Sequence, residues 1–219
     1  LRVDLSHEEV ARFSVNQHLF KGVEINAQLQ RFYGEAEMTA HALGYVGRIS
    51  EKDLQKISAS DYAGTSHIGK IGIEKTYESI LHGTVGLQQV EVDVLGKPVR
   101  ILEQTAPVPG KNLHLHMDVH LQKVATQALG DHNGAVVAID PNNGGVLALV
   151  SKPGFDPNLF VEGISSKNYN ALQADINKPL YNRALRGQYP PGSTVKPFVG
   201  LAGLESATIA ADSSKFCPG

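Results

Sequence analysis

The sequence lacks several features that define common classes of protein. It has one cysteine, Cys217, so an internal disulfide is excluded, and a metal site at this thiol would need partners that the chain does not obviously provide. With 20 Lys and Arg residues against 22 Asp and Glu, the net charge of −2 gives no support for nucleic-acid binding. No run of about 18 apolar residues predicts a membrane-spanning helix, and no signal peptide begins the chain.

The composition is that of an ordinary folded protein. The 219 residues are 42% hydrophobic and 19% charged, and this length could bury one large core or two modest ones. Histidines in the first half are scattered without the spacing of metal ligands, so we expect no metal site there: His7, His18, His41, His67 and His82.

The most informative stretch is residues 189–198, YPPGSTVKPF. Ser193 and Lys196 are three residues apart, a spacing that places two side chains on one face of a helix. Pro197 is tolerated only in a first helical turn, so the helix should begin close to Ser193, with Gly192 allowing the backbone to turn into it. The hydroxyl would then lie at the positive end of the helix dipole, which favours a developing oxyanion.

This pair predicts a hydroxyl nucleophile and its base. An amine accepts a serine proton only when it is neutral, so burial or nearby positive charge must lower the pKa of such an amine. The tetrapeptide alone is a weak signal, because most Ser-x-x-Lys pairs are a surface serine and a solvated lysine. The proline and glycine residues before Ser193 and the proline after Lys196 reverse that balance.

Three segments resemble one family of enzymes. Residues 156–165, 179–184 and 189–198 are similar to the corresponding blocks of class B penicillin-binding proteins, most closely those that act in cell elongation. Ser-x-x-Lys is a signature of penicillin-binding proteins. The likeness runs along the whole chain and is strongest from about Asn112 onward.

The resemblance implies an α+β fold with two parts. Residues 1–111 would form a pedestal, a non-catalytic domain of the dimerisation type, and residues 112–219 the N-terminal portion of a truncated transpeptidase domain, a sheet with packed helices. Pro107, Pro109 and Gly110 interrupt regular structure at this boundary.

The resemblance also implies a serine-type peptidoglycan D,D-transpeptidase and carboxypeptidase, which cross-links stem peptides during elongation of rod-shaped cells and is a target of β-lactams. Ser193 would attack the penultimate D-Ala carbonyl and Lys196 would accept its proton, without a metal or another cofactor. The pedestal would contact membrane proteins of the elongation machinery, a glycosyltransferase and a scaffold. The expected location is the bacterial inner membrane, with the single-pass anchor outside this chain and the domains in the periplasm.

The family's active site needs two further motifs, Ser-x-Asn and Lys-Thr/Ser-Gly, and neither follows Ser193. In the family, the strand that carries the lysine motif presents a backbone N–H to the oxyanion, and loss of one such donor costs about a hundred- to a thousandfold in rate. We therefore expect the 219-residue chain alone not to turn over D-Ala-D-Ala peptides and not to be acylated efficiently by penicillins.

Two other functions share parts of this pattern. A serine β-lactamase or β-lactam sensor also carries Ser-x-x-Lys, but such single-domain proteins lack an N-terminal half like this one. The chain could instead be a non-catalytic interaction module that binds cell-elongation partners. Deacylation of bound penicillin within minutes would favour the first alternative, and binding to a scaffold or glycosyltransferase the second.

Further patterns predict the N-terminal elements. Capping boxes at Ser6 and Ser50 begin two helices, and a third covers residues 73–81. Alternating apolar residues predict four strands, of which the last two form a hairpin: residues 1–5, 22–29, 88–94 and 97–102.

In the C-terminal half, residues 112–117 alternate like a strand, and Asp118 caps a helix whose inward stripe is expected to be Leu121, Val124, Ala125, Ala128 and Leu129. Two apolar runs, residues 134–139 and 145–150, predict a hairpin that is buried on both faces. The apolar residues after Lys196 predict a helix to about Ser206, central and buried.

Residues 151–188 are rich in Pro, Asn, Gly and Ser, with a short helix expected at 167–175. They form either a long surface connection or, from the resemblance, a segment across the transpeptidase face that brings Arg183 and Tyr189 near the site. We prefer the second interpretation and assign neither residue a catalytic role.

Overall fold

The computed structural model describes residues 5–27, 29–94 and 98–216 of the chain. The N-terminal half, up to residue 111, contains in order α1 (His7–Asn16), η1 (Gln17–Leu19), α2 (Ala36–Leu43), β1 (Tyr45–Arg48), α3 (Glu51–Leu54), β2 (His67–Ile71), α4 (Gly72–Thr76), α5 (Glu78–Leu81), β3 (Leu87–Val92) and β4 (Pro98–Thr105). The C-terminal half, from residue 112, contains α6 (Val119–Ala128), β5 (Gly134–Ile139), β6 (Val146–Lys152), α7 (Asn158–Val161), α8 (Ser166–Ala174), α9 (Arg183–Arg186), η2 (Gly192–Val195) and α10 (Lys196–Glu205). Helices and antiparallel strand pairs together confirm the predicted α+β class.

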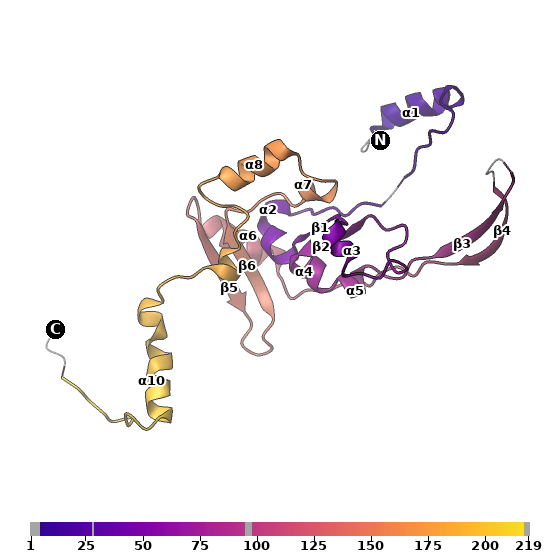
Figure 1. The fold of residues 1–219 in the computed structure, drawn as a ribbon. Coiled ribbons are helices and arrows are strands. Elements are labelled where there is room, and N and C mark those ends of the chain that lie inside the picture. Colours follow the sequence, from indigo (N-terminus) through magenta and orange to yellow (C-terminus); the bar gives the residue numbers. More distant parts are fainter. Residues whose placement is uncertain (1–4, 28, 95–97, 217–219) are drawn as a thin grey trace.

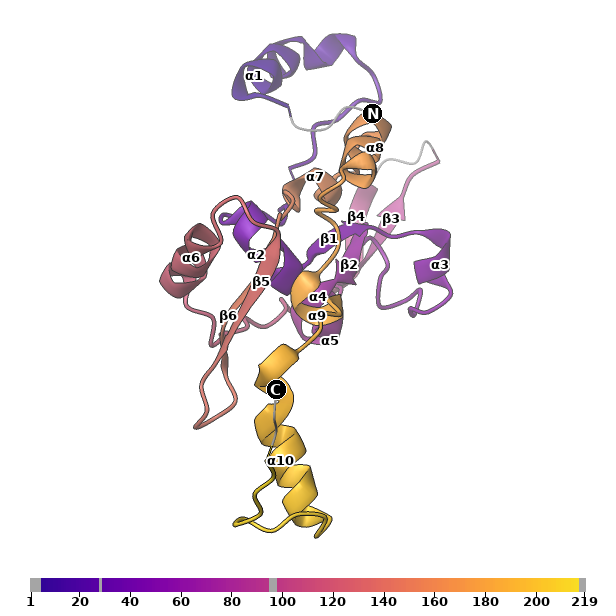
Figure 2. The same cartoon turned by 90° about the vertical axis from the view of Figure 1, so that its left-hand side faces the viewer.

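Three parts project from a central body (Figure 1). The body contains the β1–β2 and β5–β6 pairs with α2, α4, α6 and α9 around them. The α1 helix with its linker and the β3–β4 hairpin extend on one side of this body, and α10 extends on the opposite side (Figure 2). The helix that carries Lys196 is therefore far from the N-terminal projections.

Both halves of the chain build the apolar core. Ala40 of α2 is fully buried, and Phe155 and Phe160 are nearly so. The ring of Phe160 stacks on Tyr45 of β1 with 4.4 Å between ring centroids, and it meets Phe155 edge to face at 5.6 Å. Part of the segment 151–188 thus packs against the N-terminal half. The alternative of a long surface connection is wrong for residues 155–161, which supply two aromatic rings of the core, whereas α8 within the same segment has no buried residue.

One glutamine joins α6 to its neighbours. Asp118 caps α6 as predicted, and Gln122 in the first turns of this helix is fully buried. Its Nε2 donates to the carbonyl oxygens of Met38 at 2.6 Å and Leu149 at 2.8 Å, and its Oε1 accepts from the backbone N of Leu149 at 2.9 Å. The amide takes the place of a neighbouring strand at this edge of β6. The strand predicted at residues 112–117 is absent, so that prediction is wrong.

Several elements that were predicted from short sequence patterns are present, and others differ. The capping boxes of α1 and α3, the β3–β4 and β5–β6 pairs, and the helix at α8 are confirmed. The helix predicted at 73–81 is divided at Tyr77 into α4 and α5. The strand predicted at 22–29 is wrong, because residues 23–27 belong to no strand. Of the strand predicted at 1–5, residues 1–4 lie outside the described part of the chain.

Burial of the β5–β6 hairpin is one-sided. Alternate residues of β5 are exposed, with Val137 at 45% and Ile139 at 56%, whereas Ala148 and Val150 of β6 are buried. The predicted burial on both faces is wrong for β5. The physical reason is that α2 and α6 cover β6, while β5 pairs with β6 alone among the described strands.

Candidate active site

Ser193 and Lys196 lie on two adjoining helical turns. Ser193 belongs to the 3₁₀ turn η2, and Lys196 is the first residue of α10. The backbone N–H of Lys196 donates to the carbonyl oxygen of Ser193. In a 3₁₀ turn, residues three apart lie on the same side. Both residues therefore lie at the beginning of a helix, with their Cα–Cβ bonds on the same side of the turn.

The residues around the pair explain why the helix begins here. Gly192 has a φ of +56°, a conformation that glycine adopts without the steric cost of a Cβ. Pro197 lies in the first turn of α10, where its missing N–H leaves no helical hydrogen bond unmade. The predicted start of the helix is confirmed.

The surroundings of α10 differ from the prediction. Ser193 and Lys196 are both exposed, and α10 has no buried residue, with Phe198 at 72% and Leu201 at 58% exposure. The prediction of a central, buried helix is therefore wrong for this chain. Within the described residues, the one element in substantial contact with α10 is the adjoining turn η2, and α10 points away from the body (Figure 2). The described residues therefore do not bury Lys196 as a lysine base requires.

Arg183 forms part of a turn within its own segment. Its guanidinium donates to the carbonyl oxygens of Asn177 at 2.5 Å and Lys178 at 3.2 Å. Tyr189, four residues before Ser193, is 63% exposed. In the described chain, neither side chain is hydrogen-bonded to the candidate pair. The sequence pattern drew attention to Arg183 but did not predict that its guanidinium bonds to the carbonyl groups of this turn.

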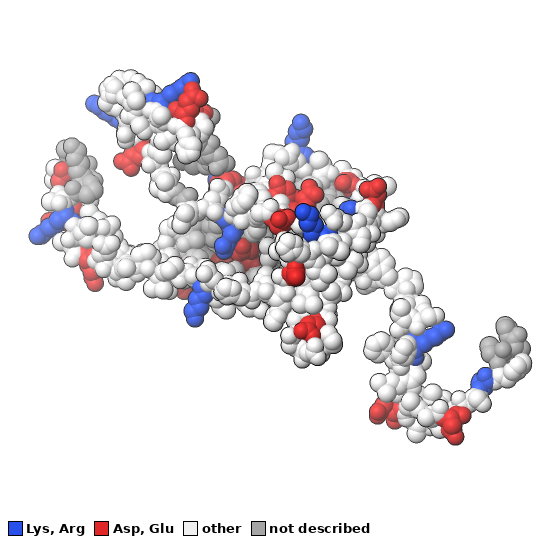
Figure 3. All heavy atoms as spheres, turned by 180° about the vertical axis from the view of Figure 1, so that it is seen from behind, with Lys and Arg blue, Asp and Glu red and all other residues white. Residues whose placement is uncertain are grey.

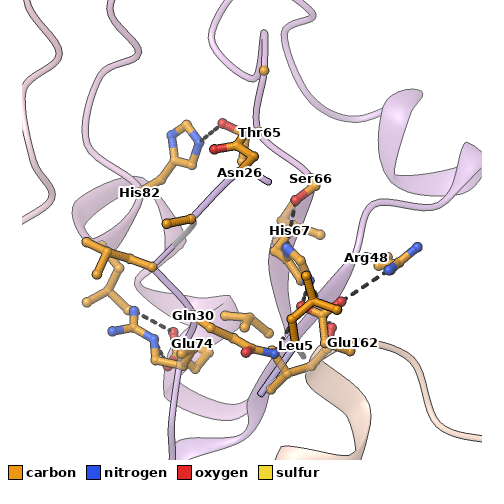
Figure 4. A pocket seen from close by; sticks show the side chains of 18 of the residues that line it. Leu5, Asn26, Gln30, Arg48, Thr65, Ser66, His67, Glu74, His82 and Glu162 are labelled. Carbon is orange, nitrogen blue, oxygen red and sulfur yellow. Dashed lines mark hydrogen bonds and ion pairs between the residues drawn. The ribbon is translucent and has the colours of Figure 1, made fainter. Parts of the chain in front are cut away.

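A cavity of about 1120 Å³ lies between the linker that follows α1 and the body, lined mainly by the N-terminal half and also by Val161 and Glu162. Figure 4 shows that its side chains come from distant segments and pair with one another. Arg48 contacts Glu162 at 3.1 Å, and Nε2 of His67 lies 2.9 Å from the carbonyl oxygen of Val161. Because the residues are far apart in sequence, no local motif could have revealed this cavity.

A buried polar network borders the cavity. Glu74 is 7% exposed and pairs with Arg31 at 2.9 Å. The Tyr33 hydroxyl donates to Oε1 of Glu74 at 3.2 Å and accepts from the backbone N of Val46 at 2.8 Å. Burial, with the nearby Glu74 charge, raises the pKa of Tyr33 well above its ordinary value. The phenol donates to the carboxylate and accepts from the backbone, so it links β1 to α4.

Charged side chains and possible metal ligands are the other features of the described residues that could form a second site. On the face in Figure 3, side chains of both charges are scattered over the body and the projections. Within residues 5–27, 29–94 and 98–216, no three His, Cys, Asp or Glu residues are placed to share a metal ion. In the same ranges, no helix has both the length and the apolarity to cross a membrane.

Two family models match the chain. The model of the penicillin-binding protein dimerisation domain matches residues 1–115, and that of the penicillin-binding protein transpeptidase domain matches residues 134–219. The chain belongs to the penicillin-binding proteins. The resemblance inferred from the Ser193 region is thereby confirmed, as is the combination of a dimerisation domain with a transpeptidase domain.

Curated penicillin-binding relatives match along nearly the whole chain. The peptidoglycan D,D-transpeptidase MrdA of Acinetobacter baumannii is 48% identical over 209 residues, and that of Escherichia coli is 44% identical over 223 residues. These matches cover 95% and 100% of this chain but only 31% and 35% of the relatives. The chain thus spans about a third of their length.

Solved penicillin-binding proteins have a similar fold. Penicillin-binding protein 2 of Pseudomonas aeruginosa, in complex with WCK 5153, is 49% identical with a TM-score of 0.78, over 90% of this chain and 40% of that one. Penicillin-binding protein 2 of Helicobacter pylori, in complex with MreC, is 32% identical with a TM-score of 0.84, over 98% of this chain and 41% of that one.

Proposed function

We propose that the chain is part of a peptidoglycan D,D-transpeptidase in which Ser193 is the nucleophile and Lys196 its base. The observation that carries the proposal is the position of this pair, on adjoining turns at the start of α10, in a chain that matches a transpeptidase domain. The relatives named peptidoglycan D,D-transpeptidase support the same reaction class.

The chemistry is a two-step acyl transfer. Oγ of Ser193 attacks the penultimate D-Ala carbonyl carbon of a stem peptide while Nζ of Lys196 accepts the hydroxyl proton. The peptide bond breaks and the terminal D-Ala leaves as the amine with the proton from Lys196. An amine of a neighbouring stem peptide then gives up a proton and attacks the acyl-enzyme, which forms the cross-link, breaks the ester bond and restores the Ser193 hydroxyl. A β-lactam acylates the same serine. The N-terminal end of a helix stabilises the negative charge that develops on the carbonyl oxygen.

The proposed activity belongs to the longer protein. A lysine base must be desolvated or lie beside positive charge, and Lys196 is exposed among the described residues. We infer that the remainder of a transpeptidase domain covers the exposed apolar residues of α10 and encloses the amine. The 219-residue chain alone is therefore not acylated efficiently by penicillins.

Labelling of the full-length protein with a fluorescent penicillin tests the assignment. Wild type should be labelled stoichiometrically and Ser193→Ala not at all. Lys196→Ala should be acylated about a hundred- to ten-thousandfold more slowly, because it lacks the general base. Ser206→Ala, at the other end of the same helix, is the matched control and should be labelled like wild type.

Two results would overturn the assignment. Labelling of the Ser193→Ala protein would place the nucleophile elsewhere. Loss of the label from wild type within minutes would instead indicate a β-lactamase, since a transpeptidase holds the penicilloyl group for much longer. Labelling of the isolated 219-residue chain at the rate of the full-length protein would refute the inferred role of the covering domain.

We also propose that the N-terminal half binds a scaffold protein of the MreC type, at the periplasmic face of the bacterial inner membrane. The H. pylori relative in complex with MreC supports this partner class. The projecting β3–β4 hairpin exposes apolar side chains that have no covering element in the described chain, including Leu87 at 72% and Ile101 at 54% exposure. A membrane glycosyltransferase is the second proposed partner.

Binding to the MreC homologue of the same bacterium tests the first partner. In the full-length protein, Ile101→Lys should weaken binding at least tenfold, because a buried apolar contact would be replaced by a charge. Leu54→Lys, at a comparably exposed position on α3, is the control and should bind like wild type. Equal affinity of all three proteins would remove the hairpin from the interface.

A further inference from the structure

Asn182 connects the two halves of the chain through its side-chain amide. Nδ2 donates to the main-chain oxygen of His41 at 3.0 Å, and Oδ1 accepts from the backbone N of Leu185 at 3.1 Å. His41 lies in the last turn of α2, where carbonyl groups have no partner within the helix. One amide thus caps the C-terminal end of α2 and the N-terminal end of α9.

The residues on either side of Asn182 are held by β6. Ser151 is 5% exposed, and its Oγ accepts from the backbone N of Arg183 at 2.9 Å and donates to the carbonyl oxygen of Tyr181 at 3.3 Å. The tripeptide 181–183 is therefore fixed between a strand of the C-terminal half and a helix of the N-terminal half.

The fixed region continues toward Ser193. The hydroxyl of Tyr181 donates to the carbonyl oxygen of Arg186, at the end of α9. A Cβ on Gly187 would collide with the ring of Tyr189, so the chain is closely packed there. This bonded and packed region ends at Tyr189, four residues before Ser193, and η2 and α10 extend from its end (Figure 1).

We propose that Asn182 is a positioning residue for Ser193, which couples α2 of the N-terminal half to the segment that presents the nucleophile. The inference rests on the proposed function of Ser193. An asparagine suits this role because its side chain is both a donor and an acceptor, whereas an aspartate only accepts. A displacement of α2 would be transmitted through the amide to α9 and along the segment that is packed as far as Tyr189, from which the backbone continues for four residues to Ser193.

Acylation kinetics of the full-length protein test the coupling. Fluorescent penicillin at increasing concentrations separates the acylation rate constant from the penicillin dissociation constant. Asn182→Asp keeps the acceptor that caps α9 but loses the donor to α2, so its acylation rate constant should fall about tenfold or more, with every molecule still labelled at the end. This size follows from the about hundredfold cost of a 1 Å misplacement at a reacting atom. Asn182→Ala should lose at least as much.

A matched control and a second variant complete the design. Ser165→Ala removes the cap of α8, where Oγ accepts from the backbone N of Asn168 at 3.2 Å. This variant should react within about twofold of wild type, because the lost hydrogen bond joins neither α2 nor β6 to residues 181–183. Ser151→Ala loosens the same tripeptide from β6 and should lower the rate constant severalfold. It provides the measurement if the Asn182 variants fold poorly.

The outcomes separate the two proposals. A wild-type protein that is not labelled at Ser193 refutes the proposed function. Labelled wild type with an unchanged rate constant in Asn182→Asp and Ser151→Ala refutes the coupling alone. A lower final labelled fraction with an unchanged rate constant also refutes it, because that result reports unfolded molecules and not a misplaced serine.

Discussion

Two helices of equal length, α6 and α10, show opposite relations between composition and burial. Each has ten residues, and α10 is the more apolar of the two. Yet α10 has no buried residue, while α6 buries Ala125 and the polar Gln122. The difference lies in the neighbours, because α6 packs against β6 and α2, whereas α10 has no such neighbour in the described chain.

The contrast shows what makes a polar side chain the better choice in a core. The edge of β6 presents backbone N–H and C=O groups that must find partners once they are buried. The side-chain amide of Gln122 supplies both a donor and an acceptor, so the C=O and the N–H of Leu149 are both hydrogen-bonded. An apolar side chain at this position would exclude water from those groups without replacing it.

The largest expected effect concerns Phe198 on α10. In the full-length protein, where we infer that α10 is covered, Phe198→Ala should destabilise the folded state by about 3–5 kcal/mol, the usual cost of removing a buried phenyl ring. In the 219-residue chain the same change should cost no more than about 0.5 kcal/mol, because the ring is 72% exposed. Urea unfolding of both proteins measures the two values. Equal values would mean that α10 is in the same environment in both.

The next effect concerns Gln122. In Gln122→Leu, the carbonyl oxygens of Met38 and Leu149 lose their donor and the N–H of Leu149 loses its acceptor, so we expect a destabilisation of about 3 kcal/mol in urea unfolding. The control is Gln127→Leu on the exposed face of the same helix, with an expected change within about 0.5 kcal/mol. A Gln122→Leu protein as stable as wild type would show that β6 finds other partners for its edge.

A second buried polar contact tests whether Gln122 is a special case. Tyr33→Phe removes the donor to Glu74 and the acceptor for Val46, so we expect a loss of about 2 kcal/mol in the free energy of unfolding. Tyr77→Phe is the control, because this ring is 42% exposed. If both variants unfold at the same urea concentration as wild type, the buried hydroxyl contributes nothing net to stability.

The sequence predicted those features whose causes are local. The capping box of α1 joins Ser6 to Glu9, and the start of α10 follows from Gly192 and Pro197, so each could be recognised within a few residues. The inward face of α6 could not be recognised in this way, because the partners of Gln122 come from other segments. Leu121 and Val124 were expected to be buried and are exposed.

The same distinction applies to the candidate site. The spacing of Ser193 and Lys196, together with Gly192 and Pro197, predicted that the pair lies at the beginning of a helix, and all of these signals lie within residues 192–197. The link from Asn182 to His41 spans 141 residues of sequence, and the cavity between the α1 linker and the body is lined by equally distant segments. Periodicity describes one element at a time, so it carries no information on such contacts.

The smallest expected effect is a pH dependence at His41, in the helix that Asn182 caps. Burial lowers the pKa of His41 below its ordinary value, with the Arg183 charge acting in the same direction and the carbonyl groups of Pro153 and Pro179 opposing it. The unfolded chain keeps the ordinary value of about 6.5 and therefore binds the proton more readily. Stability that is present above this pH should decrease as the pH falls below it.

Replacement of the imidazole should remove this part of the pH dependence. Unfolding of His41→Gln and wild type, measured from pH 8 to pH 5, should show a smaller loss of stability in the variant, whatever their difference at pH 8. Parallel curves would mean that another group titrates. Because His41 contacts Phe155 edge to face at 5.3 Å, its protonation would place a charge in the core that both halves share, the opposite of the satisfied polar burial seen at Gln122.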